Sequence, residues 1–133
     1  MSLVVLIATL ALIQFIVFSM LVGRARMKYG VKAPAMTGHP IFERYIRVQM
    51  NTLEQLAVFL PALFMFYTMA ESRGWYSYQI ASVCGLVWLI GRTLYARSYV
   101  QDPDRRGVGF LMTFAPSAVM IIGTLVAVFA SLA

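Results

Sequence analysis

Four long apolar stretches constrain the fold of this chain more than any other feature. The first, residues 3–23, has only Thr9, Gln14 and Ser19 as polar side chains and is long enough to cross a hydrocarbon core of about 30 Å. The others cover residues 56–70, 80–90 and 108–133. These runs are continuous and do not alternate with a period of two, so they predict membrane helices and not barrel strands. We therefore expect an all-α, integral membrane four-helix bundle: a single domain over residues 1–133, with spans near residues 3–26, 41–72, 75–100 and 107–132.

The composition agrees with a membrane protein. Of the 133 residues, 61% are hydrophobic and 12% charged, and the mean hydropathy of +0.78 is rare in a soluble domain. No basic segment precedes the first apolar run and no small-residue cleavage site follows it, so we expect a retained span and not a signal peptide. The single cysteine, Cys84, and the isolated His39 predict neither an intramolecular disulfide nor a metal site.

The basic residues predict the orientation of the chain. By the positive-inside rule, the first and third loops face the cytoplasm, and both termini and the second loop face the opposite side. Trp75, Tyr76 and Tyr78 fit an aromatic belt at that opposite interface. Short loops favour a bacterial inner membrane, and membrane lipid explains the net charge of +6 without nucleic acid. All basic residues except Arg73 flank the first and third loops, namely Arg24, Arg26, Lys28, Lys32, Arg44, Arg47, Arg92, Arg97, Arg105 and Arg106.

A polar seam runs along the second predicted helix before its apolar part begins. At 100° per residue, Arg44, Arg47, Asn51 and Glu54 occupy an arc of about 80°, which is one helix face. The seam lies at the cytoplasmic headgroup level, where several ionisable side chains in one helix indicate a functional site.

A second polar face lies at the same end of the third helix, where Arg92, Tyr95 and Tyr99 share an arc of about 60°. Arginine forks bind carboxylates and Glu54 could hold an ammonium group, so the two faces suit a small zwitterionic peptide. Two alternatives stay open: an ion-pair network of Arg44, Arg47 and Glu54 that only orders the bundle, and an interfacial aromatic belt of the two tyrosines. Arg97 is expected to be a topology determinant.

These residues resemble a known family. Phe42-Glu43-Arg44, then Arg47-Val48-Gln49-Met50-Asn51 and Glu54, resemble the second-helix signature of the MAPEG superfamily, the membrane-associated proteins in eicosanoid and glutathione metabolism. The segment from Arg92 to Tyr99, with Arg106, resembles its third-helix region. The resemblance implies a homotrimer of four-helix subunits that binds glutathione between neighbouring subunits near the cytoplasmic face.

The resemblance also implies roles for individual residues. Arg106 matches the arginine that stabilises the glutathione thiolate, although the neighbouring Arg105 leaves the register open by one residue. Gln55 replaces a tyrosine, and Met27 stands where leukotriene synthase members have a second catalytic arginine, so leukotriene synthesis is not expected. The matched glutathione-binding positions are Arg26, from the adjoining subunit, and Arg47, Gln49, Asn51, Glu54, Tyr95 and Tyr99; the supporting positions are Arg44, Gln55, Arg92 and Arg105.

The favoured interpretation is a membrane-embedded glutathione transferase that acts on a lipophilic electrophile, with peroxidase activity on a lipid hydroperoxide open as a second reaction. Glutathione would be the co-substrate, with no metal. One alternative is a non-enzymatic relative that binds lipid or a partner protein. Another is a small proton-coupled exporter, which needs an acidic residue within the membrane; the first apolar run has none, and Glu54 is the only deep candidate.

Overall fold

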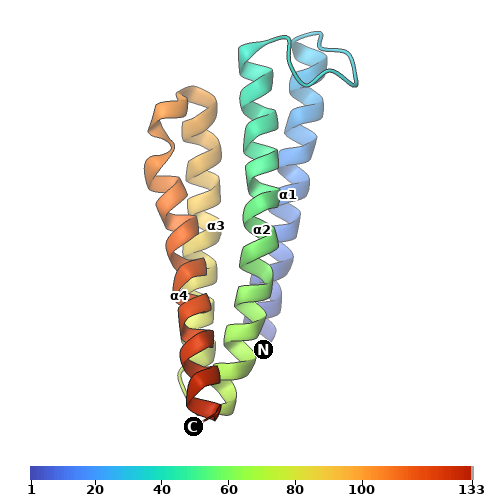
Figure 1. The fold of residues 1–133 in the computed structure, drawn as a ribbon. Helices are drawn as coiled ribbons and strands as arrows, with labels where there is room; N and C mark the ends of the chain where they lie inside the picture. The colour runs from blue at the N-terminus through green and yellow to red at the C-terminus, as the bar shows by residue number, and fades with distance from the viewer. Residues whose placement is uncertain (133) are drawn as a thin grey trace.

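The computed structural model describes residues 1–132 and consists of four long helices (Figure 1). These are α1 (Ser2–Lys28), α2 (Pro40–Ser72), α3 (Ser77–Gln101) and α4 (Gly107–Leu132), with a short 3-10 helix, η1 (Pro103–Arg106), between the last two. No strand occurs within residues 1–132, so the expectation of an all-α fold with four helices is confirmed. Ala133, the last residue of the predicted domain, lies outside the described residues.

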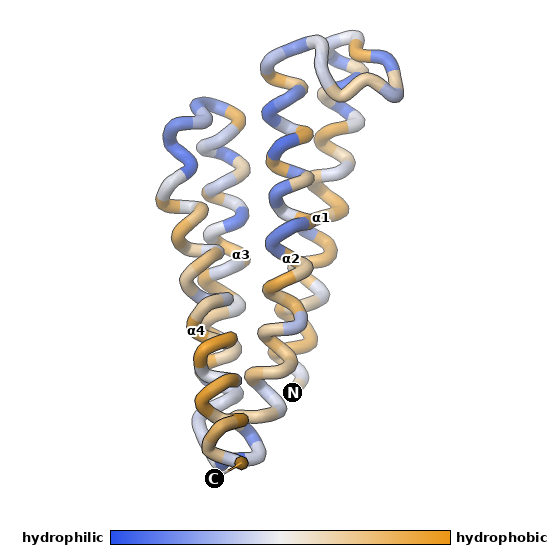
Figure 2. Tube along the Cα trace, viewed as in Figure 1, coloured by the Kyte–Doolittle hydropathy of each residue, from blue (hydrophilic) through white to orange (hydrophobic). Residues whose placement is uncertain are grey.

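Each long helix is apolar and long enough to cross a membrane. Figure 2 shows that the hydrophobic residues follow the helices toward the termini, whereas hydrophilic residues gather at the other end, on α2, the last turns of α3 and η1. Large apolar side chains such as Met20 and Phe129 point outward and are more than two-thirds exposed. An apolar surface of this kind is stable in contact with the hydrocarbon of a bilayer. The chain is therefore a multi-pass membrane protein.

The helices form two adjacent pairs, α1 with α2 and α3 with α4, which separate toward the end that carries the first loop and η1 (Figure 1). Both termini lie at the opposite end. α2 contacts all three other helices and thus occupies the position from which its polar seam can meet α3.

The connection between α3 and α4 is more ordered than the loop expected from residues 101–107. Pro103 disfavours helical geometry at the residue before it, and α3 accordingly ends at Gln101. Asp102 then accepts a hydrogen bond at its Oδ1 from the backbone N–H of Asp104 (3.1 Å) and caps η1. This capped turn sets the position of Arg105 and Arg106 relative to the end of α3.

Close packing between helices holds the site end in place. In the apolar core the rings of Phe59 and Trp88 stack with centroids 4.3 Å apart. Near the polar end, a Cβ added to Gly109 of α4 would lie only 2.6 Å from the Cα of Tyr95. Only glycine permits this approach, so the backbone of α4 sets the position of Tyr95 on α3.

Candidate functional site

Arg92 is the centre of the polar contact between α2 and α3. It is fully buried, and it donates hydrogen bonds to Asn51 Oδ1 (3.0 Å) and Thr52 Oγ1 (2.8 Å) on α2. Its guanidinium carbon lies 4.3 Å from the ring centroid of Tyr95, within cation–π range. Its Nε has no hydrogen-bond partner within the described chain. Neutral acceptors and one aromatic face therefore hold a buried cation at the helix interface.

Asn51 connects this buried cation to an exposed carboxylate. Its Oδ1 accepts from Arg92, and its Nδ2 donates to Glu54 Oε2 (3.3 Å). Because Arg92 offers only donors, it fixes which end of the Asn51 amide faces α3. The amide N–H groups are thereby directed toward the face that carries Glu54, where the carboxylate is open to a ligand.

Two tyrosines and one arginine continue the polar group from α3 to η1, with Tyr95 buried, Tyr99 partly buried and Arg106 exposed. The rings of Tyr95 and Tyr99 stack with centroids 5.5 Å apart, and the guanidinium carbon of Arg106 lies 6.0 Å from the Tyr99 centroid. Arg105 instead pairs with Asp102 (3.6 Å) and is 74% exposed. Within the described chain, Arg106 and not Arg105 lies over the Tyr99 ring.

Arg44 holds the end of α3. It donates hydrogen bonds to the carbonyl oxygens of Val100 (3.0 Å) and Gln101 (2.9 Å), which are among the carbonyls that a helix C-terminus leaves without intrahelical partners. Beside it, an open pocket of about 420 Å³ is lined by Pro40, Glu43, Arg44, Arg47 and Tyr99. Arg47 is exposed there, so a ligand in this pocket can reach its guanidinium.

The predicted ion-pair network of Arg44, Arg47 and Glu54 does not form. Within residues 1–132 the single salt bridge is that of Arg105 with Asp102. Ion pairs among these three residues therefore do not order the helices within residues 1–132. The interhelical order comes instead from hydrogen bonds that Arg44 and Arg92 donate to neutral oxygens.

Three of the predicted residues lie away from this face. Arg26 donates to the carbonyl oxygens of Val31 and Ala35 in the first loop. Gln49 is two positions from both Arg47 and Asn51, so it points to the other side of α2. Gln55 lines a separate apolar cavity of about 270 Å³ between α2 and α4.

Sequence reasoning undervalued Arg92 and did not identify Thr52. Thr52 is completely buried and donates its own hydroxyl to Val48 O (2.7 Å) while it accepts from Arg92. The sequence signal that could have identified Thr52 is the position of Arg92 deep in a membrane helix, because a buried guanidinium needs hydrogen-bond acceptors on a neighbouring helix. Within the described residues, no group of three or more His, Cys, Asp or Glu side chains could hold a metal ion.

Comparison with known proteins gives consistent matches over most of the chain. The MAPEG family model matches residues 4–126. An uncharacterised protein of Synechocystis sp. is 46% identical over 123 residues, 92% of this chain and 85% of that protein. Microsomal glutathione S-transferase 2 of Homo sapiens is 38% identical over 106 residues, covering 79% of this chain and 67% of the relative. Leukotriene C4 synthase of Cavia porcellus is 36% identical over 107 residues, covering 77% and 67%.

Proposed function

The chain belongs to the MAPEG family, and on this premise we propose that it is a membrane-embedded glutathione transferase that joins the thiol of glutathione to a lipophilic electrophile. The observation that carries the proposal is the hydrogen-bonded series from Arg92 through Asn51 to Glu54. It presents oriented amide donors and a carboxylate beside the exposed Arg47. Glutathione has two carboxylates, one ammonium group and one thiol, and this combination of charges complements it.

The proposed binding roles follow from the side-chain chemistry. Arg47 binds a carboxylate, Glu54 binds the ammonium group, and Asn51 donates to a backbone carbonyl of the tripeptide. Tyr95 and Tyr99 form the wall beside it. Arg92 supports the site through Asn51 and makes no contact with the ligand.

The homotrimer implied by the resemblance accounts for the two predicted binding residues that lie elsewhere. Arg26 is held by the first loop, and Gln49 points away from Arg47 and Asn51. In the proposed trimer, each contacts the glutathione bound by the adjoining subunit. Gln55, at the α2–α4 cavity, then borders the path of the apolar substrate.

Arg106 is the proposed catalytic residue. Its guanidinium favours the thiolate over the thiol, and the thiolate is the reactive nucleophile. The thiolate sulfur attacks the electrophilic carbon and forms the thioether, while the leaving group departs with its electron pair, as chloride does from a chlorodinitrobenzene. Reduction of a lipid hydroperoxide would use the same thiolate, which attacks the terminal peroxide oxygen and breaks the O–O bond. The alkoxide takes up a proton and leaves as the alcohol, and the glutathione sulfenic acid reacts with a second glutathione to give the disulfide and water.

The proposed location is the bacterial inner membrane, with the first and third loops in the cytoplasm. The basic residues around these loops support it, as does their position at one end of the bundle with both termini at the other (Figure 1). Glutathione then arrives from the cytoplasm, and the lipophilic substrate arrives from the bilayer.

The test is glutathione binding and conjugation to a chlorodinitrobenzene by the protein purified in detergent. Arg106→Ala should keep glutathione binding and lose at least about tenfold in kcat, since it removes one charged stabiliser of the thiolate. Arg105→Ala tests the alternative register and should retain the parental rate, and Arg73→Ala is a matched control at the other end of the molecule. A parent protein without glutathione binding or turnover refutes the proposal and favours the non-enzymatic alternative.

A further inference from the structure

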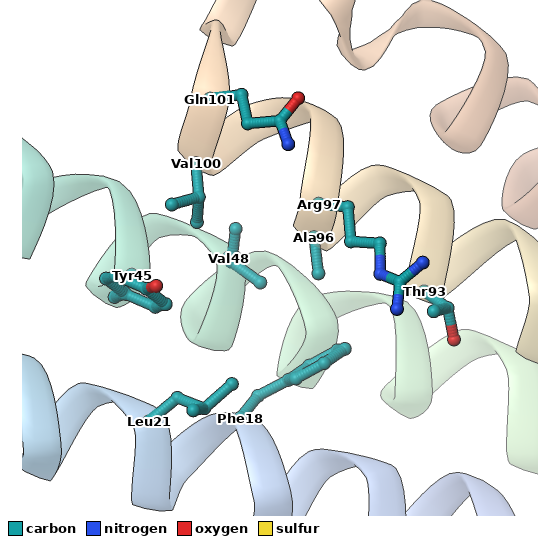
Figure 3. Close-up of a pocket in the computed structure, with 9 residues that line it drawn as sticks. All are labelled: Phe18, Leu21, Tyr45, Val48, Thr93, Ala96, Arg97, Val100 and Gln101. Atoms are coloured by element: carbon teal, nitrogen blue, oxygen red, sulfur yellow. The ribbon is translucent and has the colours of Figure 1, made fainter.

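A second cavity lies on the other side of the α2–α3 contact. Its volume is about 440 Å³, within the range of about 300–1,000 Å³ for small-molecule sites. Figure 3 shows Phe18 and Leu21 of α1 on one side, Arg97 and Gln101 of α3 on the other, and Val48 of α2 behind them. The cavity therefore lies within one subunit, between three helices.

Hydrogen bonds hold together the three helices that surround this cavity. The bonds from Arg44 to Val100 O and Gln101 O join α2 to α3 at the end of the cavity nearest the third loop. Lower down, Gln14 of α1 donates to Thr93 Oγ1 (2.8 Å) and to Leu89 O (3.1 Å) of α3. Since Gln14 is one turn before Phe18, it ties α1 to α3 at the end nearer the bilayer centre. These bonds fix the spacing of α1, α2 and α3 around the cavity.

The lining is apolar with one positive charge. Phe18, Val48 and Ala96 supply hydrocarbon and aromatic surface, whereas Arg97 is the one charged residue among those lining the cavity within residues 1–132. Arg97 is exposed and has no side-chain hydrogen bond or ion pair in the described part of the chain. Gln101 adds an amide donor one turn closer to the third loop. A ligand that satisfies these groups needs a long apolar portion and a single anionic head.

From this complementarity we propose that the cavity binds a free fatty acid, held by its carboxylate on Arg97 and by its chain on the apolar walls. The planar guanidinium matches the two oxygens of one carboxylate. Arg97 lies near the third-loop end of α3, where an acid head can stay at headgroup depth while its chain passes Phe18 and continues into the bilayer. Glutathione does not fit, because no acidic residue among the described lining residues could receive its ammonium group. The proposal does not depend on transferase activity.

The experiment uses the whole protein in phosphatidylcholine nanodiscs without glutathione, with palmitic acid that carries a diazirine on a carbon close to its carboxylate as the probe. Photolabelling should concentrate on α1 and α3 segments around Phe18 and Ala96, and unlabelled palmitate should compete. Arg97→Gln should weaken binding by about tenfold or more, because it removes a charge-assisted contact. Arg73→Gln, an arginine-to-glutamine change at the opposite end, should match the parent. Ala96→Phe should abolish the labelling by filling the cavity.

Each contrary result identifies a different failure. Labelling of the parent protein that is spread evenly over all lipid-facing helices, or that unlabelled palmitate does not reduce, would show ordinary contact with the bilayer. Either result alone would overturn the proposal. Equal binding of hexadecanol and palmitate, with binding by Arg97→Gln unchanged, would refute the claim that the cavity selects an anionic head group through Arg97. Competition by phosphatidylglycerol at the same concentration as palmitate would assign the cavity to a bilayer phospholipid instead. Glutathione binding, measured separately on the same protein preparations, distinguishes failure of this proposal from failure of the proposed function.

Discussion

Replacement of Thr52 by valine tests whether Arg92 depends on its hydroxyl acceptor. The substitution nearly preserves side-chain volume but removes the oxygen that lies 2.8 Å from an Arg92 nitrogen. Both residues are completely buried, so water cannot replace the lost partner. A buried donor without a partner retains its full desolvation cost.

The expected loss is that of a hydrogen bond to a charged group, about 1.5–3 kcal/mol in the free energy of unfolding. Neutral hydrogen bonds between membrane helices average only about 0.6 kcal/mol. The charge on Arg92 and its burial place this contact above that average. Thr52→Ser keeps the hydroxyl and should recover most of the stability.

Reversible unfolding in mixed micelles of increasing dodecyl sulfate content, followed by far-UV circular dichroism, measures this difference. Thr68→Val is the matched control, because Thr68 is exposed on the same helix and bonds only to Phe64 O and Met65 O of that helix. It should stay within about 0.5 kcal/mol of the parent. If Thr52→Val also stays within about 0.5 kcal/mol, Arg92 does not depend on this acceptor, and our reasoning about the α2–α3 contact is wrong.

Three further predictions concern binding, packing and topology. Asn51→Ala should weaken glutathione binding about tenfold by calorimetric titration, because it removes an oriented amide donor and its link to Arg92; unchanged affinity would remove Asn51 from the site. Gly109→Ala should cost about 1–3 kcal/mol in the same unfolding assay, because its Cβ would meet the backbone of Tyr95; a fully stable variant would contradict the close approach. In a cysteine-free background, an impermeant thiol reagent should label Thr37→Cys only from the cytoplasm and Ser131→Cys only from the other side; labelling of both from one side would refute the topology.

The sequence predicted the helical elements well because the signals for them are local. Continuous apolar runs within a membrane must form helices to satisfy their backbone groups, and the polar seam from Arg44 to Glu54 follows from helical periodicity alone. The 3-10 geometry of residues 103–106 was not predicted. Its cause, the cap by Asp102, leaves only a short and ambiguous pattern in the sequence.

The candidate site was predictable as a set of residues but not as an arrangement. Sequence by itself determined that arginines, an asparagine and a glutamate share one face of α2, because spacing along one helix is a local property. Only the tertiary structure decided that Arg92 is buried against Asn51 and Thr52, that Arg44 binds the end of α3, and that Arg97 faces a cavity on the other side. Those outcomes depend on how α2 and α3 are turned toward each other. Packing among all four helices sets that rotation, and no segment encodes it alone.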